Sequence, residues 1–250
     1  MDKNIFQGRV ALITGATTSI GRATALAFAQ HGAKVAIGGI DEQSNETVEL
    51  IEKMGGEAAF FRTNLTNGKA VKALVEQTVE KFGGLHHAFN YSTSLLNIPT
   101  KFTEIDEDDF NQVMAVDVKG IFLAVKYQLQ NMVGNGGGTI VNMASLTGLM
   151  ADPYIVPYVA ANHAVIGLTK AAAFDYAEEG IRVNAIEPVL TETSVTELWR
   201  DPVKKKSFPM PRSVRPDEIA DMVIFLSSDA ASFCNGFVYG VNRTNFPLTS

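Results

Sequence analysis

The chain of 250 residues lacks several features that mark particular classes of protein. Its single cysteine, Cys234, excludes an internal disulfide and is typical of a reducing compartment. No apolar run is long enough to cross a bilayer, and the N-terminus lacks the apolar stretch of a signal peptide. The net charge of −6 argues against a nucleic-acid-binding surface. We therefore expect a cytoplasmic protein that binds neither nucleic acid nor a membrane, and that acts on a small molecule.

Short apolar segments, in contrast, are abundant and alternate with helix-like ones. Strands are expected at 9–13, 34–37, 58–61, 85–89, 139–143, 181–186 and 238–241, and helices at 20–30, 42–54, 69–82, 108–132 and 158–178. Continuous apolar strands separated by helices are typical of a parallel sheet covered on both faces. No repeat or linker divides the chain. We therefore predict an α/β fold with a doubly wound parallel sheet, Rossmann-like, in a single domain over residues 1–250.

The segment after the first predicted strand has the character of a phosphate-binding turn. It reads Thr14-Gly15-Ala16-Thr17-Thr18-Ser19-Ile20-Gly21. Glycines in such a turn let backbone N–H groups at a helix N-terminus approach a pyrophosphate. Gly15 and Gly21 are present, but Ser19 stands where a third glycine is expected. Because tight strand-to-helix turns need glycine in any case, this turn alone leaves nucleotide binding open.

A second pattern places a serine and a tyrosine where both can grip one carbonyl oxygen. Ser145 closes an apolar run, and Tyr158 follows thirteen residues later and opens the segment Tyr-x-x-x-Asn that ends at Asn162. Two hydroxyl donors aimed at one oxygen stabilise the negative charge that develops there. Since Asn162 carries no charge, the segment contains no cation to lower the Tyr158 pKa from its ordinary value of about 10.

Together these motifs resemble the short-chain dehydrogenase/reductase family over essentially the whole chain. The match rests on the turn at 14–21, on Ser145 and Tyr158 at the family spacing, on Arg182-Val183-Asn184-Ala185-Ile186 before Pro188, and on the segment 226–231. The resemblance implies an enzyme that binds NAD or NADP and moves a hydride between the nicotinamide and a carbonyl or alcohol. Its tetrad of Asn, Ser, Tyr and Lys becomes Asp117, Ser145, Tyr158 and Asn162 in this sequence.

The resemblance also implies which residues would contact the cofactor, and several depart from the family pattern. Gly39 stands where the family carries an acidic or basic residue for the ribose, and Asn64 replaces an aspartate beside the adenine. The family's Asn-Asn-Ala-Gly becomes Asn90-Tyr91-Ser92-Thr93, which puts bulk beside the cleft. The implied set is Gly15, Ser19, Ile20, Gly21, Gly39, Asn64, Leu65, Asn90, Pro188 and Thr193, with no metal. We therefore expect weak or absent binding of NAD(P)(H).

These departures leave three functions open. The first is an enzyme that acts on a small carbonyl or hydroxyl compound through Ser145 and Tyr158 without hydride transfer, as an isomerase, cyclase or dehydratase does. Asp117 is its candidate base if burial raises the Asp117 pKa. The second is an ordinary NAD(P)-dependent ketoreductase, and the third is a catalytically inactive scaffold. The resemblance further implies a substrate loop at about 189–215 and a homodimer or homotetramer built on the helices at 108–132 and 158–178.

Overall fold

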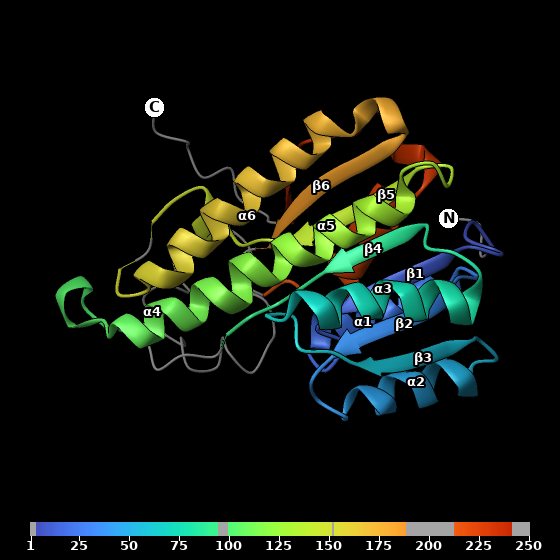
Figure 1. The fold of residues 1–250 in the computed structure, drawn as a ribbon, viewed down its shortest axis with the longest axis horizontal. Helices are drawn as coiled ribbons and strands as arrows, with labels where there is room; N and C mark the ends of the chain where they lie inside the picture. Colours follow the sequence, from blue (N-terminus) through green and yellow to red (C-terminus); the bar gives the residue numbers. More distant parts are fainter. Residues whose placement is uncertain (1–3, 95–99, 152, 189–212, 242–250) are drawn as a thin grey trace.

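The computed structural model describes residues 4–94, 100–151, 153–188 and 213–241. Within them, seven parallel strands form one sheet in the order β3-β2-β1-β4-β5-β6-β7 (Figure 1). The strands are β1 (Val10–Thr14), β2 (Lys34–Gly39), β3 (Ala58–Arg62), β4 (His87–Asn90), β5 (Gly138–Met143), β6 (Ile181–Pro188) and β7 (Val238–Val241). The predicted α/β fold, a doubly wound parallel sheet in a single domain, is confirmed.

Helices cover both faces of this sheet (Figure 1). They are α1 (Ser19–Gln30), α2 (Ser44–Lys53), α3 (Gly68–Phe82), α4 (Glu107–Val113), α5 (Gly120–Met132), α6 (Val156–Asp175) and α9 (Pro216–Ser227). Helices α1, α2 and α9 pack on one face, and α3, α5 and α6 on the other. Among the described residues, none of these helices is long and apolar enough to span a bilayer.

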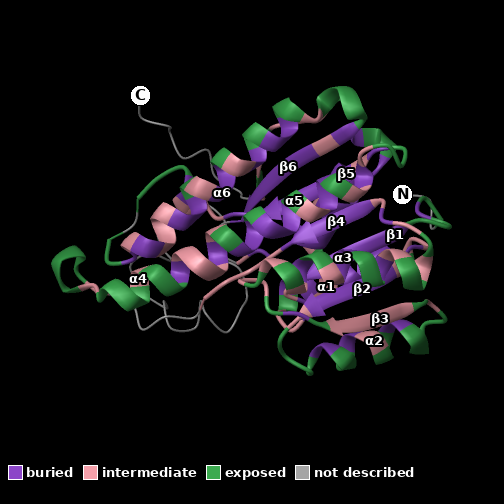
Figure 2. Ribbon diagram, in the orientation of Figure 1, coloured by how far each residue is buried: buried purple, intermediate pink, exposed green. Residues whose placement is uncertain are grey.

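The core consists of one large apolar cluster on each face of the sheet. Neighbouring strand residues face opposite sides, so Ala11 and Ile13 of β1 join the cluster under α1 while Leu12 joins the cluster under α5 and α6. All five residues of β1 are buried (Figure 2). Burial on both faces explains why the strands read as continuous apolar runs rather than as alternating ones.

The helix predicted at 108–132 is not a single α-helix. It is interrupted between α4 and α5 by a π-helical segment, η2 (Met114–Lys119), which contains the buried Asp117. A π-helical segment of this kind is rare and frequently marks a functional site. The interruption therefore fixes where the Asp117 side chain points.

Helix α9, which follows the expected substrate loop, is not among the helices that the apolar pattern predicts. The signals for it are nevertheless present. Pro216 stands in the first turn, where its missing N–H is not needed, and Asp217 and Glu218 follow it near the helix N-terminus. A search for helix starts rather than for apolar periodicity would have found this element.

Candidate active site

The site is built at the edge of the sheet where β1, β4, β5 and β6 end. Strand β1 lies between β2 and β4, so the chain direction around the sheet reverses at this point. In open parallel sheets the crevice at such a reversal, outside the carboxyl ends of the strands, is where ligands bind. Gly15 and Ser145 follow two of these strands, and Tyr158 lies in the first turn of the helix after β5.

Ser145 and Tyr158 come together here, as the sequence predicts. Ser145 follows β5 and begins the short 3-10 helix η3 (Leu146–Gly148). Helix α6 begins at Val156 with Pro157 in its first turn, which also contains Tyr158. Both the Ser145 hydroxyl and the Asn162 side chain lie within hydrogen-bonding reach of the Tyr158 phenol. The pair is thus arranged to share one substrate oxygen.

The electrostatic setting keeps Tyr158 protonated. Burial raises the pKa of the Tyr158 hydroxyl above its ordinary value, and the nearby Asp117 carboxylate raises it further, while hydrogen bonds from Ser145 and Asn162 only partly offset the rise. The Asn162 amide also donates to the Tyr158 backbone carbonyl at 2.8 Å. Because Asn162 brings no positive charge, the phenol is a proton donor at neutral pH and not an acceptor.

Asp117 lies in the same cavity and titrates near neutrality. Its carboxylate accepts hydrogen bonds from the Ser94 backbone N–H at 2.9 Å and from the Ser94 hydroxyl at 3.1 Å. Burial raises the pKa of Asp117 to about 7, against the opposing effect of these hydrogen bonds. Near pH 7 the carboxyl therefore exists in both forms, as a general acid or base requires.

The cavity itself is small, with room for about one water molecule. Its lining is formed by Tyr91, Ser92, Asp117, Met143, Ala144, Tyr158, Ala161, Asn162 and Val165. No lysine or arginine is found among these lining residues of the described structure. The cation that the family resemblance leads one to expect beside the tyrosine is thus not replaced from elsewhere in the described part of the chain.

Tyr91 is a polar residue of the site whose importance the sequence did not show beyond its bulk. Its backbone N–H donates to the Thr14 hydroxyl at 2.9 Å, and that hydroxyl donates to the Tyr91 carbonyl at 3.0 Å. A Cβ atom added at Gly15 would stand 3.3 Å from the Tyr91 ring. Tyr91 therefore lies between the phosphate-type turn and the cavity. Burial there raises the pKa of its hydroxyl.

The turn after β1 has the geometry of a phosphate site. Gly15 has a φ of 72°, and a Cβ atom at Gly21 would lie 2.2 Å from the Gly15 carbonyl oxygen, so both positions require glycine. Thr18 caps α1 by accepting from the Gly21 N–H at 3.1 Å. The backbone N–H groups of Ser19 and Ile20, in the first turn of α1, have no intrahelical acceptor and are available to an anion.

The residues implied for the ribose and adenine offer a cofactor fewer polar contacts than the turn does. A Cβ atom at Gly39 would meet only the Ser44 hydroxyl, at 3.8 Å, so the position has room but no charge. The Asn64 side-chain oxygen already accepts from the Thr66 N–H at 3.0 Å and from the Thr66 hydroxyl at 2.9 Å. Leu65 packs on a small cluster around α3 and α5. None of these three positions therefore supplies an ionised group to hold a cofactor.

The side chain of Asn90, a predicted cofactor contact, is held in a buried hydrogen-bond network. Its amide donates to Gln128 at 2.8 Å and to Asn142 at 2.9 Å, and its oxygen accepts from Gln128 at 2.7 Å. A buried amide must satisfy its donors and acceptor, and this network between β4, β5 and α5 does so. Only the Asn90 backbone remains for a ligand.

Of the two remaining predicted positions, Pro188 is described by the structure and Thr193 is not. Pro188 ends β6 at the same edge of the sheet. Thr193 and positions 189–212 of the predicted substrate loop lie outside the described residues. Among the residues that are described, no group of His, Cys, Asp or Glu could hold a metal ion.

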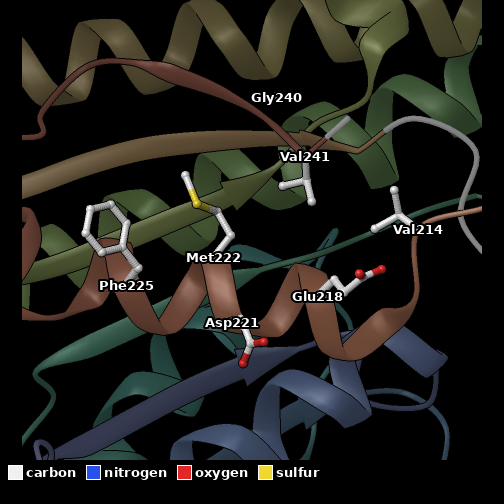
Figure 3. A pocket seen from close by; sticks show the side chains of 7 residues that line it. All are labelled: Val214, Glu218, Asp221, Met222, Phe225, Gly240 and Val241. Atoms are coloured by element: carbon white, nitrogen blue, oxygen red, sulfur yellow. The ribbon is translucent and has the colours of Figure 1, made fainter. Parts of the chain in front are cut away.

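A larger groove of about 410 Å³ lies between α9 and β7 (Figure 3). It is lined by Val214, Glu218, Asp221, Met222, Phe225, Gly240 and Val241. The side chains of Met222 and Phe225 rise from α9 toward β7 in Figure 3. This lining contains no hydroxyl or imidazole, so the groove offers no donor pair comparable to Ser145 and Tyr158.

A doubly wound sheet, a phosphate-type turn after β1 and a Ser–Tyr pair beyond β5 together define a Rossmann-like protein of the oxidoreductase class. Residues 15–243 match the family described as enoyl-(acyl carrier protein) reductase. The chain belongs to the short-chain dehydrogenase/reductase family.

Its relatives carry the names of dehydrogenases and reductases. The chain is 39% identical to cyclohexanol dehydrogenase of Acinetobacter sp. (strain SE19), over 96% of this chain and 95% of the relative. It is also 39% identical to a 2,5-dichloro-2,5-cyclohexadiene-1,4-diol dehydrogenase of Sphingobium indicum, over 92% of this chain and 93% of the relative. Among solved structures, levodione reductase aligns with a TM-score of 0.90 at 30% identity, covering 95% of this chain and 97% of the other.

Proposed function

We propose that the protein is an oxidoreductase that reduces a small cyclic ketone, with Tyr158 as the proton donor and Ser145 as its partner on the substrate oxygen. The observation that carries this proposal is the Tyr158 phenol, which lies within hydrogen-bonding reach of Ser145 at the carboxyl edge of the sheet. A hydroxyl pair at this place can hold a carbonyl oxygen while it gains negative charge.

The choice of a cyclic substrate follows the names of the relatives. The cyclohexanol and cyclohexadiene-diol dehydrogenases are both named for a six-membered ring that carries hydroxyl groups. Cyclohexanone and cyclohexanol are therefore the first compounds to test on this chain.

The chain's own residues would act on the proton and the oxygen. A nicotinamide, when bound, supplies or accepts the hydride. Tyr158 gives its proton to the carbonyl oxygen, and the Ser145 hydroxyl donates a second hydrogen bond to the same atom. Loss of one such donor typically lowers the rate by a factor of about 10²–10³. In the reverse direction Tyr158 must first lose its proton, and its raised pKa makes that form scarce at neutral pH.

We further propose that NAD(P)(H) binds weakly and without a clear preference for NADP. The phosphate end fits, because Gly15, Gly21 and the N-terminus of α1 have the required geometry. The rest of the cleft fits the cofactor less well. Gly39 offers the ribose no charge, and the Tyr91 ring lies against the turn where the cofactor would pass.

The test is a pair of measurements on the purified chain. Fluorescence titration with NADH and NADPH should give micromolar or weaker dissociation constants that differ little between the two. Oxidation of either cofactor should then be followed with cyclohexanone. We expect measurable turnover near pH 7 that requires Tyr158. Submicromolar binding would overturn the proposed weak affinity, and the absence of turnover with every cyclic ketone tried would overturn the proposed activity.

A second function is favoured by Asp117, whose pKa of about 7 suits proton abstraction. With Ser145 and Tyr158 on the carbonyl oxygen, Asp117 would remove a proton from the adjacent carbon, which requires no nicotinamide. Exchange of the α-hydrogens of cyclohexanone in D₂O, followed by NMR without cofactor, distinguishes the two. Exchange that depends on Asp117 supports this function, and its absence alongside cofactor-dependent turnover excludes it.

A further inference from the structure

Glu187 is a buried carboxylate that the mechanism above does not use. It is the next-to-last residue of β6, and only 4% of it is exposed. Its Oε2 atom is buried and has no hydrogen-bond partner in the described part of the chain. Buried polar groups nearly always have a partner, because leaving them unpaired is unfavourable. An orphaned carboxylate in a folded domain therefore needs an explanation.

The sheet places Glu187 on the same face as the Tyr158 cavity. Val183 and Ala185 of β6 belong to the core cluster that includes Val165 and Ile166 of α6. Side chains two residues apart along a strand share a face, so Glu187 points to the same side of the sheet as these two residues. That side is the one covered by α6, which carries Tyr158.

The register of β5 against β6 brings Glu187 still closer to the site. Met143 pairs with Ile186, and the next N–H, that of Ala144, donates to the Ile186 carbonyl at 2.8 Å. Continuing this register sets Glu187 beside Ala144, which lines the cavity and precedes Ser145. Glu187 thus lies at the carboxyl edge of the sheet, next to the segment that leads from β5 to Ser145.

Within the described part of the chain, no hydrogen bond accounts for the buried Oε2 atom of Glu187. Burial raises the pKa of Glu187 to about 6, and neither a neighbouring charge nor a hydrogen bond contributes to that shift. The group is mostly ionised at neutral pH while it is withdrawn from water. A carboxylate held in this state, one strand position from the catalytic serine, is suited to accept a hydrogen bond from a ligand.

We propose that Glu187 determines substrate specificity by accepting a hydrogen bond from a second hydroxyl group on the substrate. The substrate class is then a hydroxyketone and, in the reverse direction, a diol, rather than a simple ketone. This inference rests on the proposed function in one respect. The carbonyl group of the same substrate is held by Ser145 and Tyr158, while its hydroxyl group contacts Glu187. Glu187 would equally exclude substrates with a carboxylate at the second position, because two like charges would meet there.

Calorimetric binding to the whole chain tests the inference without requiring turnover. The probes are 4-hydroxycyclohexanone and 4-methoxycyclohexanone, which differ in the hydrogen that Glu187 would accept. The proteins are the natural chain, Glu187→Gln, Glu187→Leu and the control Glu80→Gln, which neutralises an exposed carboxylate on α3. The natural chain and the control should bind the hydroxy compound about 10- to 100-fold more tightly, as for a hydrogen bond to a charged group. Glu187→Gln should weaken this preference, and Glu187→Leu should abolish it.

Thermal unfolding of the same variants separates this role from a structural one. Glu187→Leu should unfold at the same temperature as the natural chain or higher, because it removes an unpaired buried charge. Equal binding of the two probes by the natural chain, no binding of either, a preference that survives Glu187→Leu, or clear destabilisation of both Glu187 variants would each overturn the inference. Preferential binding without any cofactor oxidation would uphold the inference and overturn only the proposed reductase activity.

Discussion

The turn after β1 and the cavity beside Tyr158 lie at the same edge of the sheet, but they differ in whether they contain buried ionisable side chains. In the turn, Thr18 and Gly21 satisfy each other through a hydrogen bond of 3.1 Å, and no ionisable side chain is involved. In the cavity, burial raises the pKa of Asp117 and of Tyr158, and no cation among the lining residues of the described structure offsets it. The turn therefore keeps its shape without buried ionisable groups, whereas the cavity holds such groups at a cost in stability.

The largest effect on activity is expected when a hydroxyl group is removed from the cavity. Tyr158→Phe and Ser145→Ala should each lower cyclohexanone reduction by a factor of about 10²–10³, because each removes one donor to the developing oxyanion. Tyr127→Phe, a change of the same chemistry on α5, should leave the rate unaltered. Steady-state kinetics checks this, and full activity in both cavity variants would show that the pair is a relic.

The stability cost of the cavity should appear in the pH dependence of unfolding. Asp117 has a pKa of 3.8 when unfolded and about 7 when folded, so the folded state holds its proton more tightly. The natural chain should therefore lose stability relative to Asp117→Asn as pH rises from about 4 to 7, and below about pH 4 the difference should no longer change with pH. At about 1.4 kcal/mol per pKa unit the full loss is up to about 4 kcal/mol.

Denaturant unfolding of both proteins between pH 4 and pH 8 measures this difference. A natural chain that gains stability over Asp117→Asn across the same interval would mean that the Ser94 hydrogen bonds outweigh burial. The turn offers the control, since Ser19→Gly touches no titratable group and should shift stability equally at every pH.

Tyr91 contacts both the turn and the cavity, and truncating its side chain should change cofactor binding at the turn. Tyr91→Ala removes the ring that lies against Gly15, and we expect NADH to bind about tenfold more tightly, a change of roughly 1.4 kcal/mol. Fluorescence titration provides the measurement, with Tyr176→Ala as a control for the loss of a tyrosine outside the cavity. Unchanged or weaker binding would indicate that Tyr91 supports the nucleotide instead of crowding it.

Restoring a cation beside Tyr158 should have a smaller effect, a shift of the pH dependence of oxidation toward lower pH. Asn162→Lys places positive charge near the phenol and should lower the pKa of Tyr158, which moves the pH dependence of cyclohexanol oxidation toward neutrality by about one unit. The variant should not by itself become an efficient dehydrogenase, since Tyr91 and Asp117 remain. Rapid oxidation at pH 7 by the single variant would show that the cofactor cleft is intact.

Much of this architecture could be predicted from the sequence, because strands buried on both faces leave long apolar runs that are hard to mistake. Ser145, Tyr158, Asp117 and Asn162 were also expected together, because they stand at the tetrad positions of the family that the sequence resembles. The hydrogen bonds of the Asn90 side chain with Gln128 and Asn142 could not be predicted, because a position at a strand end says nothing of which face the side chain takes. Glu187 escaped notice for the same reason. Its proximity to Ser145 depends on the register between β5 and β6, which no local pattern encodes.

The assembly of the protein stays a prediction. A homodimer or homotetramer through α5 and α6 should be seen by light scattering at micromolar concentration, and a monomer under those conditions would refute it. Phe174, 87% exposed at the end of α6, is an apolar side chain that such an interface could cover.

The most direct test of a Ser–Tyr site that works without a neighbouring cation is the pH dependence of the two reaction directions. Burial holds the Tyr158 pKa above its ordinary value of about 10. Cyclohexanone reduction should therefore proceed at neutral pH, while the rate of cyclohexanol oxidation should keep rising up to about pH 10 without a plateau. A plateau in oxidation below about pH 8 would contradict the account, because it would mean that Tyr158 ionises readily despite the loss of the lysine.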